Sequence, residues 1–166
     1  MRYFYTVFDT EFGWMAAVAS ENGLRRLTVP QPSADKALKL IAELIPQSSA
    51  NSAYFNDLSF RLQEYFEGNP MDFADKLDLR DSTPFQQDVY RTIGSIPYGE
   101  TRTYGWVAAA LGNPKGARGV GQALARNPIP IVVPCHRITA SGGGLGGYSG
   151  GLETKRRLLD LESASA

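Results

Sequence analysis

The only cysteine and the only histidine of the chain are adjacent, Cys135 and His136, in the stretch "IPIVVPCHRI". A thiolate is a nucleophile, and imidazole is the side chain that most readily takes up a proton near neutral pH. The apolar run predicts a buried strand that emerges at Cys135, so that burial would raise the pKa of the thiol. A reactive Cys135 therefore needs a proton acceptor nearby.

A possible third partner lies in the last predicted helix, "LETKRRLLDLE". Leu158 and Glu162 are four residues apart and share the face that packs inward. Adjacent residues of an extended chain point to opposite sides, so a water or a bend must connect Cys135 to His136. Glu162 can then orient His136, which takes the thiol proton before Cys135 attacks. The alternative is an inert buried cysteine that serves only packing.

Length and composition are those of an ordinary soluble globular protein. The 166 residues, 43% hydrophobic and 20% charged, suffice for one core or two small ones. No apolar run approaches the roughly 18 residues that span a bilayer, and the polar start is unlike a secretory signal. We expect a cytoplasmic protein with no membrane partner, the nucleus being left open. One cysteine and one histidine are too few for structural zinc, so we expect neither metal nor cofactor.

Charge is unevenly distributed although the formal net charge is zero. Residues 1–81 carry eight Lys and Arg against twelve Asp and Glu, whereas residues 82–166 carry nine against five. No carboxylate lies between Glu100 and Glu153, a span with one lysine and four arginines. Such a surface suits phosphate binding, because a carboxylate there would repel the ligand. The alternative is a Gly- and Ala-rich segment that lacks acids by chance.

The turn-rich stretch "DLRDSTPF" divides the chain into two predicted domains, 1–81 and 82–166. In the first, "RYFYTVF", "GWMAAVA" and "GLRRLTV" predict an antiparallel meander of strands. Two helices are expected at about Ala34–Ile45 and Ala53–Gly68. Nothing in this half suggests chemistry, so we interpret it as a scaffold.

The second domain begins with a well-marked helix. Thr83 is the N-cap, Pro84 the first helical residue and Gln86 completes a capping box. The expected inward stripe of this helix consists of Phe85, Val89, Ile93 and Ile96.

A helix-turn-helix is predicted next. Its first helix is "YGWVAAAL", capped by Thr103 and stopped by Gly112. Its second is "NPKGARGVGQALARNP", capped by Asn113, with Pro114 at its first position, and ended by Asn127 and Pro128.

The second helix contains three glycines that helix stability does not explain, since each costs about 1 kcal/mol relative to alanine. Close approach to a partner does explain them. Its polar residues follow one face, and Val120 and Leu124 can pack inward; that face consists of Lys115, Arg118, Gln122 and Arg126. The face fits a nucleic-acid groove, or else it is a solvated face on a helix held close to its core.

Four segments together resemble the O6-alkylguanine-DNA alkyltransferase family: "FQQDVY", "IPYGETRTYG", "GNPKGARGVGQALARNPIPIVVPCHRI" and "GGLGGYSGG". The resemblance extends from Phe85 to Glu162. It implies an α+β fold with an N-terminal ribonuclease-H-like antiparallel sheet with helices and a C-terminal winged helix-turn-helix domain. It also implies a methylated-DNA-protein-cysteine methyltransferase, which acts as a monomer on double-stranded DNA containing O6-alkylguanine, and also on O4-alkylthymine.

The resemblance assigns the reaction to five residues. Cys135 would accept the alkyl group irreversibly, so each molecule acts once, while His136, a water and Glu162 yield the thiolate. Asn127 would brace the turn before the active-site segment. Tyr104 would assist rotation of the nucleotide and donate a proton to the guanine ring.

Binding roles follow from the same resemblance. Arg118 would fill the space left by the nucleotide rotated out of the duplex, which places the helix in the minor groove. The remaining DNA contacts are expected from Lys115, Gln122, Arg126 and Thr103. The substrate base would be bound by Tyr148, Ser149 and Ile138.

The sequence departs from the family pattern at two positions. Tyr90 stands where tryptophan is usual, and Gly119 where alanine is common; both are interpreted as packing variants, and Gly119 could soften the helix. Two other classes remain open: a lesion-binding protein that does not react, which Cys135 argues against, and a cysteine hydrolase.

Overall fold

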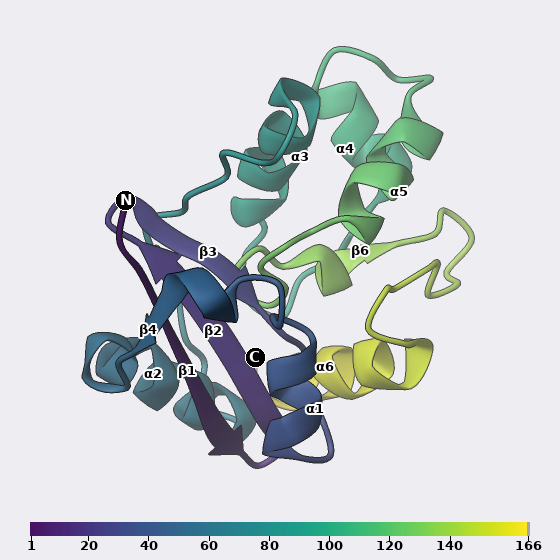
Figure 1. Ribbon diagram of the computed structural model, residues 1–166. Coiled ribbons are helices and arrows are strands. Elements are labelled where there is room, and N and C mark those ends of the chain that lie inside the picture. Colours follow the sequence, from purple (N-terminus) through teal and green to yellow (C-terminus); the bar gives the residue numbers. More distant parts are fainter. Residues whose placement is uncertain (166) are drawn as a thin grey trace. The chain divides into compact units, whose positions relative to one another are not determined.

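The structure is a computed structural model that describes residues 1–165. The chain divides into two compact units, Met1–Asp78 and Leu79–Ala166. The first holds a sheet with helices, and the second is mainly helical (Figure 1). This is the mixed α+β class predicted from the sequence.

The first unit is built on a four-stranded sheet in the order β3-β2-β1-β4. The three strands of the predicted meander are present and pair antiparallel; they are β1 (Tyr3–Thr10), β2 (Gly13–Ser20) and β3 (Gly23–Leu27). The fourth strand, β4 (Ser48–Ala50), pairs parallel to β1. It was not predicted, because three small polar and apolar residues carry no strand pattern.

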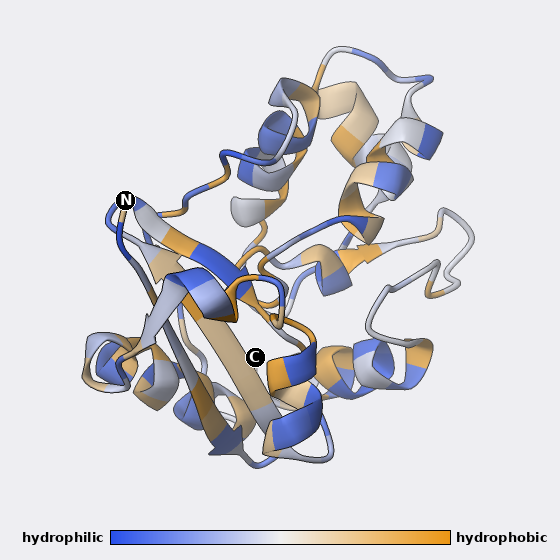
Figure 2. Ribbon diagram, viewed as in Figure 1, coloured by the Kyte–Doolittle hydropathy of each residue, from blue (hydrophilic) through white to orange (hydrophobic). Residues whose placement is uncertain are grey.

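Strand β2 is the centre of this unit. Its residues from Met15 to Ser20 are all buried, and it is apolar along most of its length (Figure 2). Ala16 and Val18 pack against helix α1, and alternation along the strand points Met15 and Ala17 to the opposite face. The sheet therefore buries both of its faces at β2.

The helices of the first unit are shorter than predicted. Helix α1 covers Ala34–Lys39, after which i to i−3 turns continue toward the 3-10 helix η1 (Ile45–Gln47). Pro46 disfavours the α conformation in the residue before it, so the expected extension to Ile45 was wrong. Helix α2 covers Asn56–Phe66 and is preceded by a 3-10 turn, η2 (Ala53–Phe55).

The second unit begins with helix α3 (Pro84–Gly94), whose predicted capping box is present. Thr83 Oγ1 accepts from the Gln86 N–H at 3.1 Å, and Gln86 Oε1 accepts from the Thr83 N–H at 2.9 Å. Val89 and Ile93 are buried as expected. The inward placement of Phe85 was wrong: its side chain is 42% exposed and lies over Gly119.

The helix-turn-helix consists of α4 (Tyr104–Ala110) and α5 (Ala117–Ala125). Thr103 caps α4 by accepting from the Trp106 N–H at 3.0 Å, as predicted. Helix α5 begins at Ala117 instead of Pro114, because the Gly116 N–H bonds to the Asn113 carbonyl and closes a separate turn. Lys115 therefore lies in the turn before the helix.

The segment after α5 is not the strand that its apolar residues predicted. Residues 128–134 form turns with a single bridge between Pro130 and Val133, and Cys135–Arg137 form a 3-10 helix, η3. Three prolines in this segment lack the N–H that a strand ladder requires, and Ile131 has a φ of 74°. The thiol thus begins a helical turn inside a buried segment.

The unit is completed by a two-stranded parallel sheet and a last helix. Strand β5 (Arg102–Thr103) pairs with β6 (Ile138–Thr139), and α6 covers Leu152–Ser165. The small sheet is consistent with a winged helix-turn-helix. Within residues 1–165, every helix is too short or too polar to cross a lipid bilayer.

Candidate active site

Cys135 is at the start of η3 and is almost fully buried, with 4% of its surface exposed. Burial raises the pKa of its thiol to about 11, while a hydrogen bond from Asn127 and the charge of Lys155 lower it. Removing the proton therefore needs an acceptor, as the sequence suggested.

A cavity of about 80 Å³ opens at this thiol. Its walls come from α4, α5, η3 and the loop before α6, and consist of Tyr104, Gly121, Leu124, Ala125, Cys135, Gly147, Tyr148 and Ser149. Four residues that the sequence assigned to chemistry or substrate binding therefore line one space. Ile138 is not among the lining residues; it is fully buried in β6.

The predicted His136–Glu162 pair is formed. His136 Nε2 and Glu162 Oε2 are 2.6 Å apart, and both side chains are buried. Burial is the main cause that lowers the pKa of His136, and Glu162 opposes it. A neutral imidazole that donates from Nε2 to the carboxylate keeps the lone pair of Nδ1, which can accept a proton.

Glu162 also has partners that the sequence did not indicate. Arg137 donates to both carboxylate oxygens, from Nε at 2.8 Å and from Nη2 at 3.1 Å, and its Nη1 donates to the Ile96 carbonyl. The Gly99 N–H donates to Glu162 Oε1 at 3.3 Å. These bonds hold the carboxylate in place, so that it orients His136. Sequence reasoning missed Arg137, since burial of a guanidinium is not visible in its spacing.

Asn127 closes the turn that precedes the thiol. Its Nδ2 donates to the Val133 carbonyl and its Oδ1 accepts from the Ile129 N–H, each at 2.9 Å. One side chain thus replaces the strand hydrogen bonds that the prolines remove, and it fixes the approach to Cys135.

Tyr104 and the loop before α6 are in contact at the cavity. The Tyr104 hydroxyl accepts from the Gly147 N–H at 3.0 Å. Gly146 has a φ of 74°, and a Cβ there would be 2.5 Å from the Tyr104 hydroxyl, so the chain passes this ring only as glycine. The hydroxyl of Tyr148 is buried and bonds to no described residue. Burial, and next Cys135, raise its pKa, so it stays protonated and can donate to a bound molecule.

Of the polar residues expected to face DNA, those on and around α5 are exposed, whereas Thr103 is half-buried. Arg118 and Gln122 lie on α5, Arg126 is its C-cap and Lys115 precedes it. Val120 and Leu124 are buried, as the pattern predicted. Tyr90, one of the two positions where the sequence departs from the family pattern, donates from its hydroxyl to the Ala123 carbonyl of α5 at 2.8 Å. The tyrosine therefore anchors this helix.

Lys155 is the second site residue that the sequence reasoning missed. It is fully buried in α6, and its Nζ donates to the carbonyls of Ile138, Leu145 and Gly147. The signal was available: Lys155 lies three residues before Leu158 and seven before Glu162, on the same inward face.

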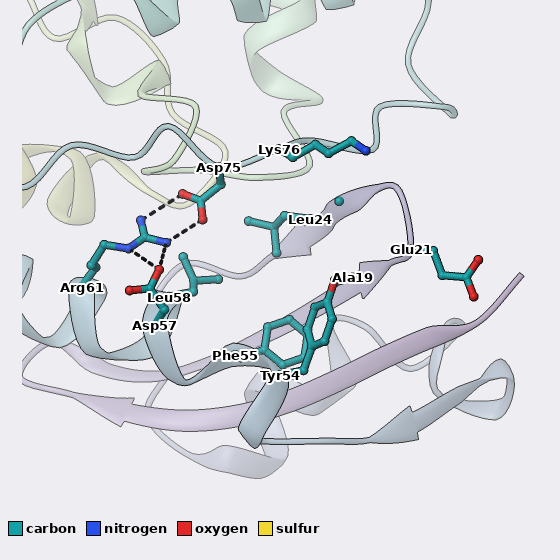
Figure 3. A pocket seen from close by; sticks show the side chains of 11 residues that line it. Ala19, Glu21, Leu24, Tyr54, Phe55, Asp57, Leu58, Arg61, Asp75 and Lys76 are labelled. Atoms are coloured by element: carbon teal, nitrogen blue, oxygen red, sulfur yellow. Dashed lines mark hydrogen bonds and ion pairs between the residues drawn. The ribbon is translucent and has the colours of Figure 1, made fainter.

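A larger hollow lies in the first unit (Figure 3). It has a volume of about 270 Å³ and is bordered by Tyr54 and Leu24 and by a charged group. In that group Arg61 bonds to both oxygens of Asp75 and to Asp57. Residues 1–165 contain no cluster of three His, Cys, Asp or Glu side chains able to hold a metal ion.

Comparison with known proteins covers both units. Residues 84–164 match the DNA-binding domain of 6-O-methylguanine DNA methyltransferase, and residues 3–79 match its ribonuclease-like domain. The methylated-DNA–protein-cysteine methyltransferase of Methanosarcina acetivorans is 40% identical over 97% of this chain and 99% of its own. The Mycobacterium tuberculosis protein of the same name is 50% identical over 64% of each chain.

Solved structures agree with these relatives. The O6-methylguanine methyltransferase of M. tuberculosis has a TM-score of 0.84 at 36% identity and covers 99% of this chain and 94% of its own. M. tuberculosis OGT in complex with DNA has a TM-score of 0.83 at 37% identity, with 98% and 94% covered. Because sequence and structure agree over both units, this chain belongs to the methylated-DNA–protein-cysteine methyltransferase family.

Proposed function

We propose that this protein repairs DNA by transferring the alkyl group from O6 of guanine to Cys135 in one irreversible turnover, with O4-alkylthymine as a second substrate. One observation carries the proposal. The only cysteine lines a small cavity, and the next residue is a histidine held by a buried carboxylate. That combination supplies a nucleophile, a proton acceptor and a space for one base.

The reaction is a displacement at the alkyl carbon. The Cys135 sulfur forms a bond to that carbon while the bond between carbon and O6 breaks. The electron pair of the broken bond stays on guanine, which takes up a proton at a ring nitrogen. Tyr104, which lines the cavity, would donate that proton. The product is a thioether, which has no thiolate left to attack a second substrate, so the protein is consumed.

The thiol proton leaves before the attack. His136 is bonded through Nε2 to Glu162, so Nδ1 is the nitrogen that can receive the proton, through a water molecule. The imidazolium that results is stabilised by the Glu162 carboxylate. Arg137 donates to the same carboxylate and holds it against the imidazole.

Two hydroxyls and one backbone segment bind the base. Tyr148 offers a buried hydroxyl that bonds to none of the described residues, and the Tyr104 hydroxyl accepts from the Gly147 N–H of the loop. Ser149 is at the cavity wall, where its backbone can contact O6. Small cavity volume favours small alkyl groups.

DNA would lie on the exposed face of α5, with Lys115, Gln122, Arg126 and the start of α4 at Thr103 near the backbone. Chemistry on a base requires its rotation out of the duplex, at a cost of a few kcal/mol. Arg118 is exposed and forms no ion pair with a described residue, so it can occupy the space left in the stack. The two glycines of α5 face the protein itself, Gly119 toward Phe85 and Gly121 toward Tyr104 at the cavity, so the expected clearance for DNA is not where they lie.

The test is the stoichiometry of transfer. The protein is incubated with a tenfold excess of duplex containing O6-methylguanine, and its intact mass and the amount of repaired DNA are measured over time. We expect one methyl group per protein molecule and repair that stops at one equivalent. Repair beyond one equivalent with an unmodified protein would support a hydrolase instead. Bound DNA with no mass gain would support a lesion-binding protein.

A further inference from the structure

Lys155 is buried more completely than a lysine ordinarily is. Removing an ammonium group from water is costly unless every N–H finds an acceptor. Here three backbone carbonyls accept from the three N–H groups, those of Ile138, Leu145 and Gly147, the last at 3.1 Å. No carboxylate of the described residues pairs with it, so its charge is not neutralised.

The three acceptors belong to separate segments around the thiol. Ile138 begins β6 and directly follows η3, which contains Cys135. Leu145 and Gly147 belong to the glycine-rich loop that forms one wall of the cavity. One ammonium therefore ties α6, β6 and this loop together. The loop sequence alone does not determine a conformation, because several of its glycines adopt positive φ.

Tyr104 is connected to the same group. The Lys155 Nζ lies 6.0 Å from the centre of the Tyr104 ring, and both residues bond to Gly147. Displacing the ammonium would release the Gly147 carbonyl and loosen the loop against the tyrosine. The cavity wall and the proton donor proposed above thus depend on one side chain.

Its charge also acts on the nucleophile. Burial raises the pKa of Cys135, and the positive charge of Lys155 opposes this shift; burial lowers the pKa of Lys155, and the Cys135 thiolate opposes that shift in turn. An uncompensated cation in a dry site acts more strongly than one at the surface, because little water screens it.

We infer that Lys155 is a positioning residue for alkyl transfer: its ammonium fixes the loop that forms the cavity wall, and its charge stabilises the Cys135 thiolate. The inference rests on the proposed function for its role in repair, but its effect on the thiol can be measured without DNA.

Two substitutions separate the hydrogen bonds from the charge. Lys155→Gln keeps N–H donors and removes the charge, whereas Lys155→Met removes both at similar length. Arg156→Met removes one positive charge from the next, exposed position of α6 and serves as the matched control. Each variant is first checked for folding by circular dichroism and thermal unfolding.

The first readout is the ionisation of the thiol without DNA. Cysteine labelled with ¹³C at Cβ gives one resonance, because the chain has one cysteine, and its shift is followed against pH. We expect the midpoint to rise by about one pH unit in both Lys155 variants, or about tenfold less thiolate at a given pH. Arg156→Met should leave it unchanged. An unchanged midpoint in folded Lys155→Gln would overturn the electrostatic part.

The second readout is hydrogen exchange of the Gly147 amide, which bonds to Tyr104. Exchange should speed up at least tenfold in Lys155→Met and much less in Lys155→Gln. Equal protection in wild type and Lys155→Met would overturn the positioning part.

A third readout is the rate of transfer from methylated duplex. Its limiting rate should slow about tenfold in the Lys155 variants, at unchanged DNA affinity. If the wild type transfers nothing, the proposed function fails while both DNA-free measurements still decide the role of Lys155.

Discussion

Two hollows, one in each unit, differ in size and in chemistry, and the smaller is lined by the only cysteine of the chain. The hollow bordered by Arg61 in the first unit is about 270 Å³, and the hollow at Cys135 in the second unit is about 80 Å³. Around the larger (Figure 3), Arg61 is bound by Asp75 and Asp57, and the pKa of Arg61 is raised chiefly by its bond to Asp75. The guanidinium of Arg61 is therefore already paired with carboxylates. Volume alone therefore does not mark a site.

Around the smaller hollow, one charged side chain has no partner of opposite charge among the described residues. Glu162 is bound to His136 and Arg137, whereas Lys155 pairs with no carboxylate of residues 1–165, and the thiol of Cys135 is buried. A thiolate at Cys135 would supply a negative charge opposite the ammonium of Lys155. The comparison teaches that an arginine and a carboxylate form an isolated pair in one unit, whereas in the other the same kind of pair holds a histidine beside the cysteine.

The largest expected effect comes from neutralising Glu162, with Asp75 as its arginine-bound counterpart in the first unit. Glu162→Gln should slow transfer about a hundredfold, because His136 loses the charge that stabilises its protonated form. Asp75→Asn makes the same change beside Arg61 and should leave transfer unchanged. Rates are measured in single-turnover assays against pH. An equal loss in both variants would break the comparison, because the effect would then be one of stability.

The second contrast is between Arg118 of the second unit and Arg61 of the first. Arg118 is exposed and forms no ion pair within residues 1–165, whereas Arg61 is bound by Asp57 and Asp75. Arg118→Ala should slow transfer from duplex DNA by about tenfold to a hundredfold, since an opened stack costs a few kcal/mol. Transfer from free O6-alkylguanine base should be nearly unaffected, and Arg61→Ala should leave DNA affinity as in the wild type. Equal losses on duplex and free base would refute the role of Arg118.

The dependence of the free energy of unfolding on pH tests the state of His136 in the proposed proton relay. Burial lowers the pKa of His136, so the unfolded chain binds its proton at higher pH than the folded one. The free energy of unfolding should thus be unaffected by this group above about pH 6.5 and fall below it, by up to about 1.4 kcal/mol per pH unit. Urea unfolding between pH 7.5 and 5.5 measures the slope. His136→Asn should remove it; a slope that persists in this variant would assign it to other groups.

The smallest effect concerns the helix that carries Arg118. Gly119→Ala should raise the free energy of unfolding by up to about 1 kcal/mol through helix propensity, because the new Cβ would lie 3.6 Å from the exposed Phe85 ring, an ordinary contact. Gly146→Ala should instead lower the free energy of unfolding, because Gly146 has a positive φ and the new Cβ would clash with the Tyr104 hydroxyl. Thermal unfolding compares the two. A destabilised Gly119→Ala variant would mean that α5 needs the glycine for its own packing.

Local signals were reliable where one side chain determines the structure. Thr83 and Gln86 predicted a capping box that is present, and the spacing of Leu158 and Glu162 placed the carboxylate inside. The same spacing applies to Lys155, but a lysine is ordinarily exposed, and so its burial went unnoticed. Its three acceptors are backbone carbonyls, which leave no trace in the sequence.

Other features depend on contacts that spacing does not encode. The apolar residues before Cys135 predicted a strand, yet three prolines and the bonds of Asn127 turn the segment instead. Strand β4 exists only because β1 offers it an edge. Arg137 meets Glu162 across 25 positions of the chain, a pairing fixed by the fold.

The most direct test of the account is the location of the transferred group. After reaction with methylated duplex, trypsin releases residues 127–137, which contain the only cysteine, by cleavage after Arg126 and Arg137. Tandem mass spectrometry of this peptide should place one methyl group on Cys135, at one equivalent per protein, and Cys135→Ala should bind the same DNA and gain none. Methylation at another residue, or repair by Cys135→Ala, would contradict the account.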